Sequence, residues 1–206
     1  MLFRILTLLF FFTSSHALEY QISFDNIPLG SLPSTWKAEA TQPNTTMAVW
    51  KVSQKQDENR VLTLKKAGDS MFNLCYTKEF IFKNTEISVD FHANSGVIDQ
   101  GGGIMWRVQD SNNYYVVRFN PLEDNFRFYV VSQGMRHQLA SATIKLSKGW
   151  HRMKIIQKDA QFEGYLDGKK LLEAKDTTIQ HAGGVGVWTK ADAATSFDNF
   201  FVKELP

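Results

Sequence analysis

Two neighbouring stretches of this sequence, one around Arg118 and one around Arg127, carry polar side chains in a pattern that could hold a ligand. Both alternate polar and apolar residues with a period of two, which is typical of half-buried β-strands. In the first stretch Arg118 and Asn120 lie opposite the apolar residues, and in the second Arg127 and Tyr129 do so. With the apolar faces in the core, these polar groups point outward from adjacent strands.

The stretch that ends in Trp188-Thr189-Lys190 follows the same rule. Trp188 shares a face with Lys190, so the indole is difficult to place in a core. A sugar requires planar polar groups that fork onto vicinal hydroxyls, and an aromatic ring that stacks on its apolar C–H face. The candidate ligand-binding residues are therefore Trp106, Arg118, Asn120, Glu123, Asn125, Arg127, Tyr129, Trp188 and Lys190.

A purely structural role for these residues stays open. Arg118 and Arg127 could pair with Glu123 and Asp124 and so hold a β-hairpin together. Trp106 could fill the core, and for this tryptophan alone the core is the favoured prediction. For the set as a whole, the sequence does not decide between binding and structure.

Other reactive side chains give weaker signals. Cys75 is the only cysteine, which excludes an internal disulfide and a thiolate zinc site, and its apolar neighbours predict a buried thiol. The histidines at positions 92, 137, 151 and 181 are not spaced as metal ligands, and His151 beside Trp150 is predicted to be structural. Asp198, between two inward-facing phenylalanines, is predicted to accept backbone N–H groups. No catalytic residue is predicted.

The elements that must position these side chains are short strands joined by turns. Strands rich in aromatic and β-branched residues are predicted at 86–91, 103–108, 113–119, 126–132 and 150–157. Asp167-Gly168 supplies the two residues of positive φ that a type I′ hairpin needs. Strands that recur about every 8 to 12 residues predict a β-sandwich. Only residues 171–180 are weakly helical, and no linker interrupts the chain.

Four motifs in the C-terminal half occur in a recognisable order. They are Trp150-His151-Arg152-Met153-Lys154-Ile155, Tyr165-Leu166-Asp167-Gly168-Lys169, Gly183-Gly184-Val185-Gly186-Val187-Trp188 and Phe197-Asp198-Asn199-Phe200. In this order they resemble laminin-G-like and concanavalin A-like domains, and the middle of the chain resembles exported members of that group. The resemblance implies an all-β jelly-roll sandwich of two curved antiparallel sheets, whose concave face often carries a sugar site.

The resemblance also raises the question of catalysis and of calcium. Glucanases of this fold carry E-x-D-x-E or E-x-D-x-x-E along one strand, which brings two carboxylates to about 5 Å; no such string occurs here. A general likeness connects the chain to a group linked to hydrolysis of 3-keto-disaccharides, but its combination of N-S-G with a later Y-E-x-Q segment is absent. Laminin-G-like domains sometimes hold calcium, for which Asp99 or Asp110 could serve. No other cofactor is expected.

The N-terminus has the composition of a secretory signal peptide. Arg4 precedes a short apolar run, and Ser15 and Ala17 are small residues at the −3 and −1 positions of a cleavage site. The run is shorter than the roughly 20 residues that a membrane span needs. We therefore expect residues 1–17 to be removed, residues 18–206 to form one domain, and the protein to be secreted or periplasmic.

The charge of the chain excludes some classes of partner. Removing residues 1–17 takes one cation and no acid from 23 Lys and Arg and 21 Asp and Glu, which leaves a net charge of +1. This predicts no nucleic-acid or anionic-lipid partner. Asn44 begins a glycosylation sequon, which matters only in a eukaryotic source.

The expected function is that of a monomeric, lectin-like module that binds carbohydrate. A glycoside-processing hydrolase of the same fold is the first alternative, and the missing glucanase string disfavours it. The second alternative is a domain that recognises another protein through its loops.

Overall fold

A computed structural model describes residues 17–44, 46–55, 59–69 and 71–206 of the chain. The alternating stretches form strands, in which the apolar face packs into the core and the backbone pairs with neighbouring strands. The strands are β1 (Glu19–Ile22), β2 (Trp36–Thr41), β3 (Val49–Gln54), β4 (Arg60–Lys66), β5 (Phe72–Phe82), β6 (Thr85–Ser95), β7 (Gly102–Asp110), β8 (Asn113–Asn120), β9 (Asn125–Ser132), β10 (Met135–Thr143), β11 (Trp150–Lys158), β12 (Gln161–Leu166), β13 (Lys169–Lys175), β14 (Gly183–Lys190) and β15 (Ala194–Glu204).

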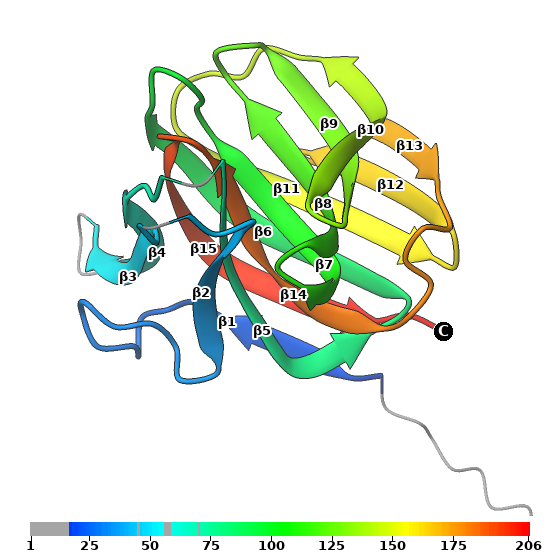
Figure 1. Cartoon of the computed structure of the whole chain (residues 1–206), viewed down its shortest axis with the longest axis horizontal. Helices are drawn as coiled ribbons and strands as arrows, with labels where there is room; N and C mark the ends of the chain where they lie inside the picture. Colours follow the sequence, from blue (N-terminus) through cyan, green and yellow to red (C-terminus); the bar gives the residue numbers. More distant parts are fainter. Residues whose placement is uncertain (1–16, 45, 56–58, 70) are drawn as a thin grey trace, which may run out of the picture.

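These strands form two antiparallel sheets that pack face to face (Figure 1). The eight-stranded sheet has the order β13-β12-β11-β6-β15-β4-β3, with β1 paired to β15. The seven-stranded sheet has the order β10-β9-β8-β7-β14-β5-β2. The predicted all-β jelly-roll sandwich is confirmed. The weakly helical stretch at 171–180 is not a helix, because β13 occupies its first half and an irregular segment follows.

The core lies between the two sheets and consists of the apolar residues that alternate inward. Phe91 from one sheet packs against Phe119 from the other, with ring centroids 6.1 Å apart. Trp106 is also inside this core, where its ring stacks on Tyr115 at 5.6 Å and meets Phe162 edge-on. With one buried cysteine and no disulfide, the fold is held by this packing.

The seven-stranded sheet curls until its two edge regions meet. The hydroxyl of Thr41 on β2 lies 2.8 Å from the hydroxyl of Tyr114 on β8, although three strands separate β2 from β8 in the sheet. The backbone N–H of Gln42 donates to Asn112 in the β7–β8 turn at 2.9 Å. A flat sheet would hold these residues about 19 Å apart at 4.8 Å a strand. The outer face of this sheet is therefore concave.

The backbone confirms the predicted Asp167-Gly168 turn and shows why glycine is needed at position 103. Asp167 and Gly168 have φ values of 48° and 78°, as a type I′ hairpin between β12 and β13 requires. Gly103 approaches the next strand so closely that an added Cβ would lie 1.8 Å from the carbonyl oxygen of Val117. The glycine run 101–103 therefore serves close backbone packing.

A bulge in β15 explains the spacing of Phe197-Asp198-Asn199-Phe200. Both phenylalanines are fully buried in the core, which strict alternation would forbid at a spacing of three. Asn199 takes a φ of 48° and the pairing with β6 shifts between Asp198 and Phe201, so one residue is added. Asp198 accepts the N–H of Asn199 and the amide of Asn59, and burial raises its pKa. Its predicted role as a backbone acceptor is confirmed.

The predicted signal peptide falls almost entirely on residues 1–16, outside the described part of the chain, and stays a prediction. Among the described residues, no helix is long and apolar enough to cross a membrane. Cys75 is fully buried, and burial raises the pKa of its thiol far above the ordinary value. This cysteine is therefore unreactive, as predicted.

Candidate functional site

The concave face of the seven-stranded sheet brings together most of the predicted site residues. The pairing register sets Trp188, Gly103, Arg118 and Arg127 side by side in one row across β14, β7, β8 and β9. Residues directly opposite one another in a sheet share a face. The outward orientation of both arginines is therefore confirmed. Gly103 has no side chain, so only its backbone lies between Trp188 and Arg118 in this row.

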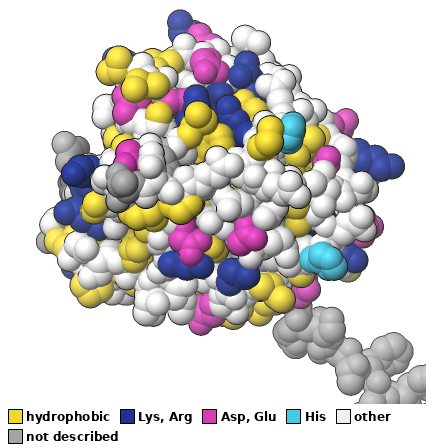
Figure 2. Space-filling view, in the orientation of Figure 1, with side chains coloured by type: hydrophobic (Ala, Val, Ile, Leu, Met, Phe, Trp, Pro, Cys, Tyr) yellow, Lys and Arg dark blue, Asp and Glu magenta, His cyan; other side chains and the backbone are white. Residues whose placement is uncertain are grey.

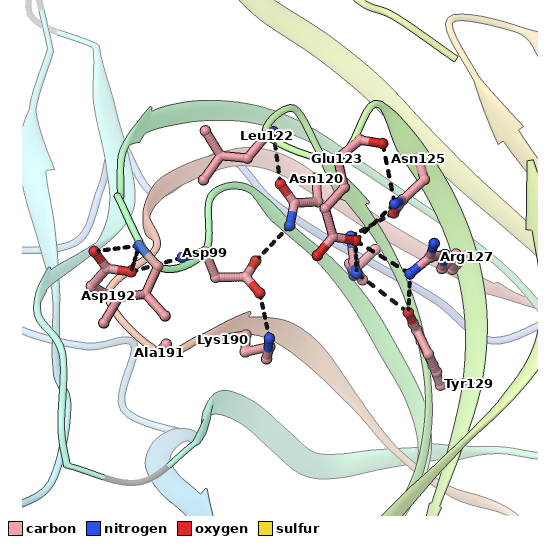
Figure 3. A network of polar contacts seen from close by, with 12 residues as sticks. Asp99, Asn120, Leu122, Glu123, Asn125, Arg127, Tyr129, Lys190, Ala191 and Asp192 are labelled. Atoms are coloured by element: carbon pink, nitrogen blue, oxygen red, sulfur yellow. Dashed lines mark hydrogen bonds and ion pairs between the residues drawn. The ribbon is translucent and has the colours of Figure 1, made fainter. Parts of the chain in front are cut away.

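A polar network links five of these residues at one end of the concave face (Figure 3). Arg118 donates from Nη1 to Oδ1 of Asn125 at 2.7 Å, and from Nη2 to Oε2 of Glu123 at 3.0 Å and to the hydroxyl of Tyr129 at 3.3 Å. Arg127 donates to the same Glu123 oxygen at 3.2 Å. Asn125 donates to it as well, at 2.7 Å. One carboxylate oxygen thus accepts from three side chains.

These donors keep Glu123 ionised. The hydrogen bond from Asn125 and the charges of Arg118 and Arg127 lower the pKa of Glu123 to about 2, against the opposing effect of partial burial. A carboxyl group with this pKa carries no proton near neutral pH. It can accept hydrogen bonds but cannot serve as a general acid.

A second branch of the network joins Lys190 on β14 to the loop before β7 (Figure 3). The ammonium of Lys190 lies 2.7 Å from Oδ2 of Asp99, and Asn120 donates to Oδ1 of Asp99 at 3.0 Å. The carboxylate of Asp192 accepts the backbone N–H groups of Asp99 and of the two residues before it. Asp192 therefore fixes the loop that positions Asp99.

Both aspartates considered for calcium have partners in the described chain, and calcium binding stays a prediction. The ammonium of Lys190 is ion-paired with Asp99. Both oxygens of Asp110 accept hydrogen bonds within its own turn, from Asn112 and Asn113. In the ranges that the structure describes, no group of three His, Cys, Asp or Glu side chains is arranged to hold a metal.

Burial divides the predicted site residues into a supporting part and an accessible part. Arg118, Asn120, Asn125 and Tyr129 are buried. The side chains of Glu123, Arg127 and Lys190 are 42%, 30% and 21% exposed, and we call these three the accessible front of the network. A ligand on the concave face would meet this front first.

Both tryptophans of the candidate set are buried, which corrects their predicted ligand contacts and confirms the core position favoured for Trp106. Trp188 is on the concave face but fully buried, because it packs on Phe72 at 5.2 Å and donates its indole N–H to Tyr114 at 3.1 Å. Trp106 lies on the other face of the sheet, in the inter-sheet core. Neither indole is open to stack on a sugar. The sheet curls round its own side chains here and forms a second apolar cluster.

Arg136 is a concave-face residue that the sequence reasoning missed. It extends from the edge strand β10 over the rings of Tyr129 at 4.2 Å, Phe72 at 5.1 Å and Trp188 at 5.9 Å. These three rings come from β5, β9 and β14, which only the curl of the sheet brings together under Arg136. The turn signal Gln133-Gly134 was the one feature of the sequence that could have indicated this position, because it folds β10 back along β9.

Two guanidinium N–H groups on this face have no acceptor in the described part of the chain. They are Nε of Arg118 and Nη1 of Arg136, and both are buried. Unsatisfied buried donors are costly, and these two add to the positive and polar character of the face. Four cations, counting Arg127 and Lys190, meet two carboxylates here, and Figure 2 shows Lys and Arg atoms gathered over β8 and β9.

The remaining candidates for chemistry have structural partners. His151 lies 2.7 Å from Oδ2 of Asp167 and 2.9 Å from the carbonyl of Ser147, so it fastens the β12–β13 turn to the segment before β11. This agrees with its predicted structural role. Asp198 is on the outer face of the eight-stranded sheet, away from the polar network.

The fold defines a class of protein, the concanavalin-like jelly-roll sandwiches that occur in carbohydrate-active proteins. Within that class, this chain belongs to the family of 3-keto-alpha-glucoside-1,2-lyase-like domains, whose model matches residues 23–203. The general likeness to this group seen in the sequence is thus confirmed. Asn94-Ser95-Gly96 is present at the end of β6, whereas the Y-E-x-Q segment is absent. No curated protein matches the sequence.

Solved structures with the same fold come from both binding modules and enzymes. The carbohydrate-binding module CBM66 from Bacillus subtilis superposes with a TM-score of 0.66 at 18% identity, over 85% of this chain and 99% of that one. Domain 4 of AbnA, an extracellular arabinanase from Geobacillus stearothermophilus in complex with arabinotriose, gives 0.63 at 11% identity over 92% and 94%. A Bacillus licheniformis β-glucanase gives 0.61 at 12% identity over 94% and 100%.

Proposed function

We propose that this protein binds carbohydrate on the concave face of its seven-stranded sheet, with Glu123, Arg127 and Lys190 as the residues that the ligand meets. The observation that carries the proposal is the accessible front itself, in which a carboxylate, a guanidinium and an ammonium group lie on one concave face and are each held by ion pairs. Sugar hydroxyls accept hydrogen bonds from such cations and donate to carboxylates such as Glu123. The carbohydrate-binding modules among the similar structures support the same ligand class.

The network explains how the buried residues contribute. Arg118, Asn125 and Tyr129 hold the Glu123 carboxylate and the Arg127 guanidinium in fixed positions, so little side-chain entropy is lost when a ligand binds. Lys190 is held in the same way by Asp99. The accessible front is therefore preorganised, although no indole is available to stack on the sugar.

A glycan array followed by calorimetry with the strongest hit tests this proposal. We expect Arg127→Ala to weaken binding at least tenfold, because it removes an accessible donor. Arg152→Ala is the matched control, since Arg152 is an exposed, ion-paired arginine on the opposite sheet, and it should bind as the wild type does. The proposal fails if the array is blank, or if the two arginine variants bind equally well.

Processing of a glycoside is the second candidate, and membership of the lyase-like family favours it. The geometry offers Glu123 as an accessible carboxylate, yet a pKa of about 2 makes it a weak base and removes it as an acid. Incubation with a 3-keto-glucoside, with the released sugar measured by chromatography, separates the two functions. Turnover that is lost in Glu123→Gln would establish catalysis, and binding without turnover would exclude it.

Export is part of the same proposal. The arabinanase whose domain shares the fold is extracellular, and the first 17 residues have the pattern of a signal peptide. Sequencing the N-terminus of the protein from the native compartment should give Leu18 as the first residue. A chain that begins at Met1 and stays in the cytoplasm would contradict the proposal.

A further inference from the structure

The outer face of the eight-stranded sheet carries a pocket that is separate from the polar network. Its volume is ≈ 520 Å³, within the range of ligand sites in proteins. Thr63 on β4 and Ser196 on β15 line it, and they alternate with the core residues Leu62 and Phe197. The pocket therefore opens away from the core, on the side of the sandwich opposite the concave face.

The register of four strands shapes this pocket. Trp150 on β11 is paired with His92 on β6, His92 with Ser196 on β15, and Ser196 with Thr63 on β4. The two small residues form a low floor, and the indole and imidazole stand at one end as a wall, with ring centroids 5.6 Å apart. An aromatic wall beside a polar floor suits a sugar ring.

Hydrogen bonds hold the polar groups of the pocket in place. Asn94 donates to the hydroxyl of Ser196 at 2.9 Å, and that hydroxyl lies 2.9 Å from the hydroxyl of Thr63. The side-chain amide oxygen Oδ1 of Asn94 lies 2.7 Å from Nδ1 of His92, and since this oxygen can only accept, Nδ1 is the donor. Nε2 of His92 has no partner among the described residues and is available to a ligand.

The charged residues that line the pocket, in the part of the chain that the structure describes, are all positive. Lys55 and Lys65 are exposed lysines, and no aspartate or glutamate is among those lining residues. The ammonium of Lys55 lies 4.1 Å from the centre of the Trp150 ring. Such a cation–π contact is weak at an exposed site, so a ligand can displace the ammonium from the ring and then pair with it.

From this combination we propose that the pocket is a second saccharide site, selective for sugars that carry a carboxylate, such as uronic acids. The sugar ring packs against Trp150, its hydroxyls exchange hydrogen bonds with Ser196 and Thr63, and its carboxylate lies between Lys55 and Lys65. This site is independent of the concave face, because it is built by the other sheet and shares no residue with the polar network.

Tryptophan fluorescence is a direct probe of this pocket. The chain has five tryptophans, and Trp36, Trp50, Trp106 and Trp188 are buried, whereas Trp150 is partly exposed. Quenching by acrylamide therefore reports mainly on Trp150. A uronic-acid oligosaccharide should protect it from quenching, and the same oligosaccharide with its carboxyl groups reduced to alcohols should bind at least tenfold more weakly. Acetate at equal carboxylate concentration should not protect it.

Charge-reversal variants then locate the carboxylate contact. Lys65→Glu should weaken uronate binding at least tenfold, and raised salt should weaken wild-type binding, because the contact is exposed. Lys169→Glu, an equal change at the exposed first residue of β13, should bind as the wild type does. Equal binding of the acidic and reduced sugars, protection by acetate, or no effect of Lys65→Glu in a folded protein would each overturn the inference.

Discussion

Arg118 and Arg127 are direct cross-strand neighbours on β8 and β9, and their guanidinium groups donate to the same oxygen atom, Oε2 of Glu123. Like charges opposite one another in a sheet repel. Glu123 offsets this repulsion from the turn between the two strands, so the hairpin and the front of the network depend on one carboxylate. The structural role considered for these arginines and a binding role are therefore compatible.

Replacement of Glu123 by glutamine should destabilise the protein by about 1 kcal/mol at pH 7, a modest figure because the side chain is partly exposed and screened by solvent. The pKa of Glu123 is about 2 in the folded protein against an ordinary 4.5. As the pH falls, the unfolded chain takes up the proton first, so the contribution is complete above pH 4.5 and disappears toward pH 2.

Urea unfolding of the wild type and Glu123→Gln between pH 2 and pH 7 checks this prediction. The free energies of unfolding should differ at neutral pH and converge in acid. Glu173→Gln, on the exposed surface of β13, is the control for a general loss of one carboxylate. A constant gap across the pH range would show that Glu123 acts through packing instead of charge.

Removal of Lys190 should be more costly than its partial exposure suggests. Asp99 is 3% exposed, and without the ammonium it would be a buried and uncompensated charge. We expect Lys190→Ala to lower the free energy of unfolding by about 3 kcal/mol. Adding Asp99→Asn should restore at least half of the loss, since the charge is then gone. Chemical unfolding of the single and double variants measures the coupling, and additive effects would contradict it.

Truncation of Trp188 on the concave face should destabilise the protein more than truncation of Trp150 on the outer face of the other sheet. Trp188→Ala should cost about 3–5 kcal/mol, because it empties a buried aromatic site under Arg136. Trp150→Ala should cost markedly less, since its ring is only partly buried. Thermal and urea unfolding of both variants tests this. A Trp188→Ala protein of unchanged stability would contradict this structural role of the indole.

Glycine 103 should tolerate no side chain. The Cβ of Gly103→Ala would lie 1.8 Å from the carbonyl oxygen of Val117, so β7 and β8 would have to separate where Arg118 is anchored. Gly168→Ala is the comparison, because its Cβ would meet nothing within 4 Å and only the φ of 78° is strained. We expect that control to lose about 1 kcal/mol. Gly103→Ala should lose several times more, as measured by urea unfolding.

Local pattern alone was enough to predict several features. Period-two alternation placed Arg118, Asn120 and Arg127 on the outward face. The dipeptide Asp167-Gly168 predicted a type I′ hairpin turn. These depend on the backbone of a few consecutive residues, which the sequence encodes directly. The order of the C-terminal motifs was enough for the jelly-roll fold, whereas the likeness to the 3-keto-disaccharide group was general and carried by no motif.

Tertiary structure alone decided which outward-facing residues are accessible. Trp188 and Arg118 point outward from their strands as predicted, yet the curl of the sheet brings Arg136 and Tyr114 over the same face and buries them. The pocket beside Trp150 joins residues from β3, β4, β6, β11 and β15, which are far apart in the chain. Alternation states which side of a strand a residue occupies. What covers that side depends on sheet curvature and strand order, which arise from contacts distant in sequence.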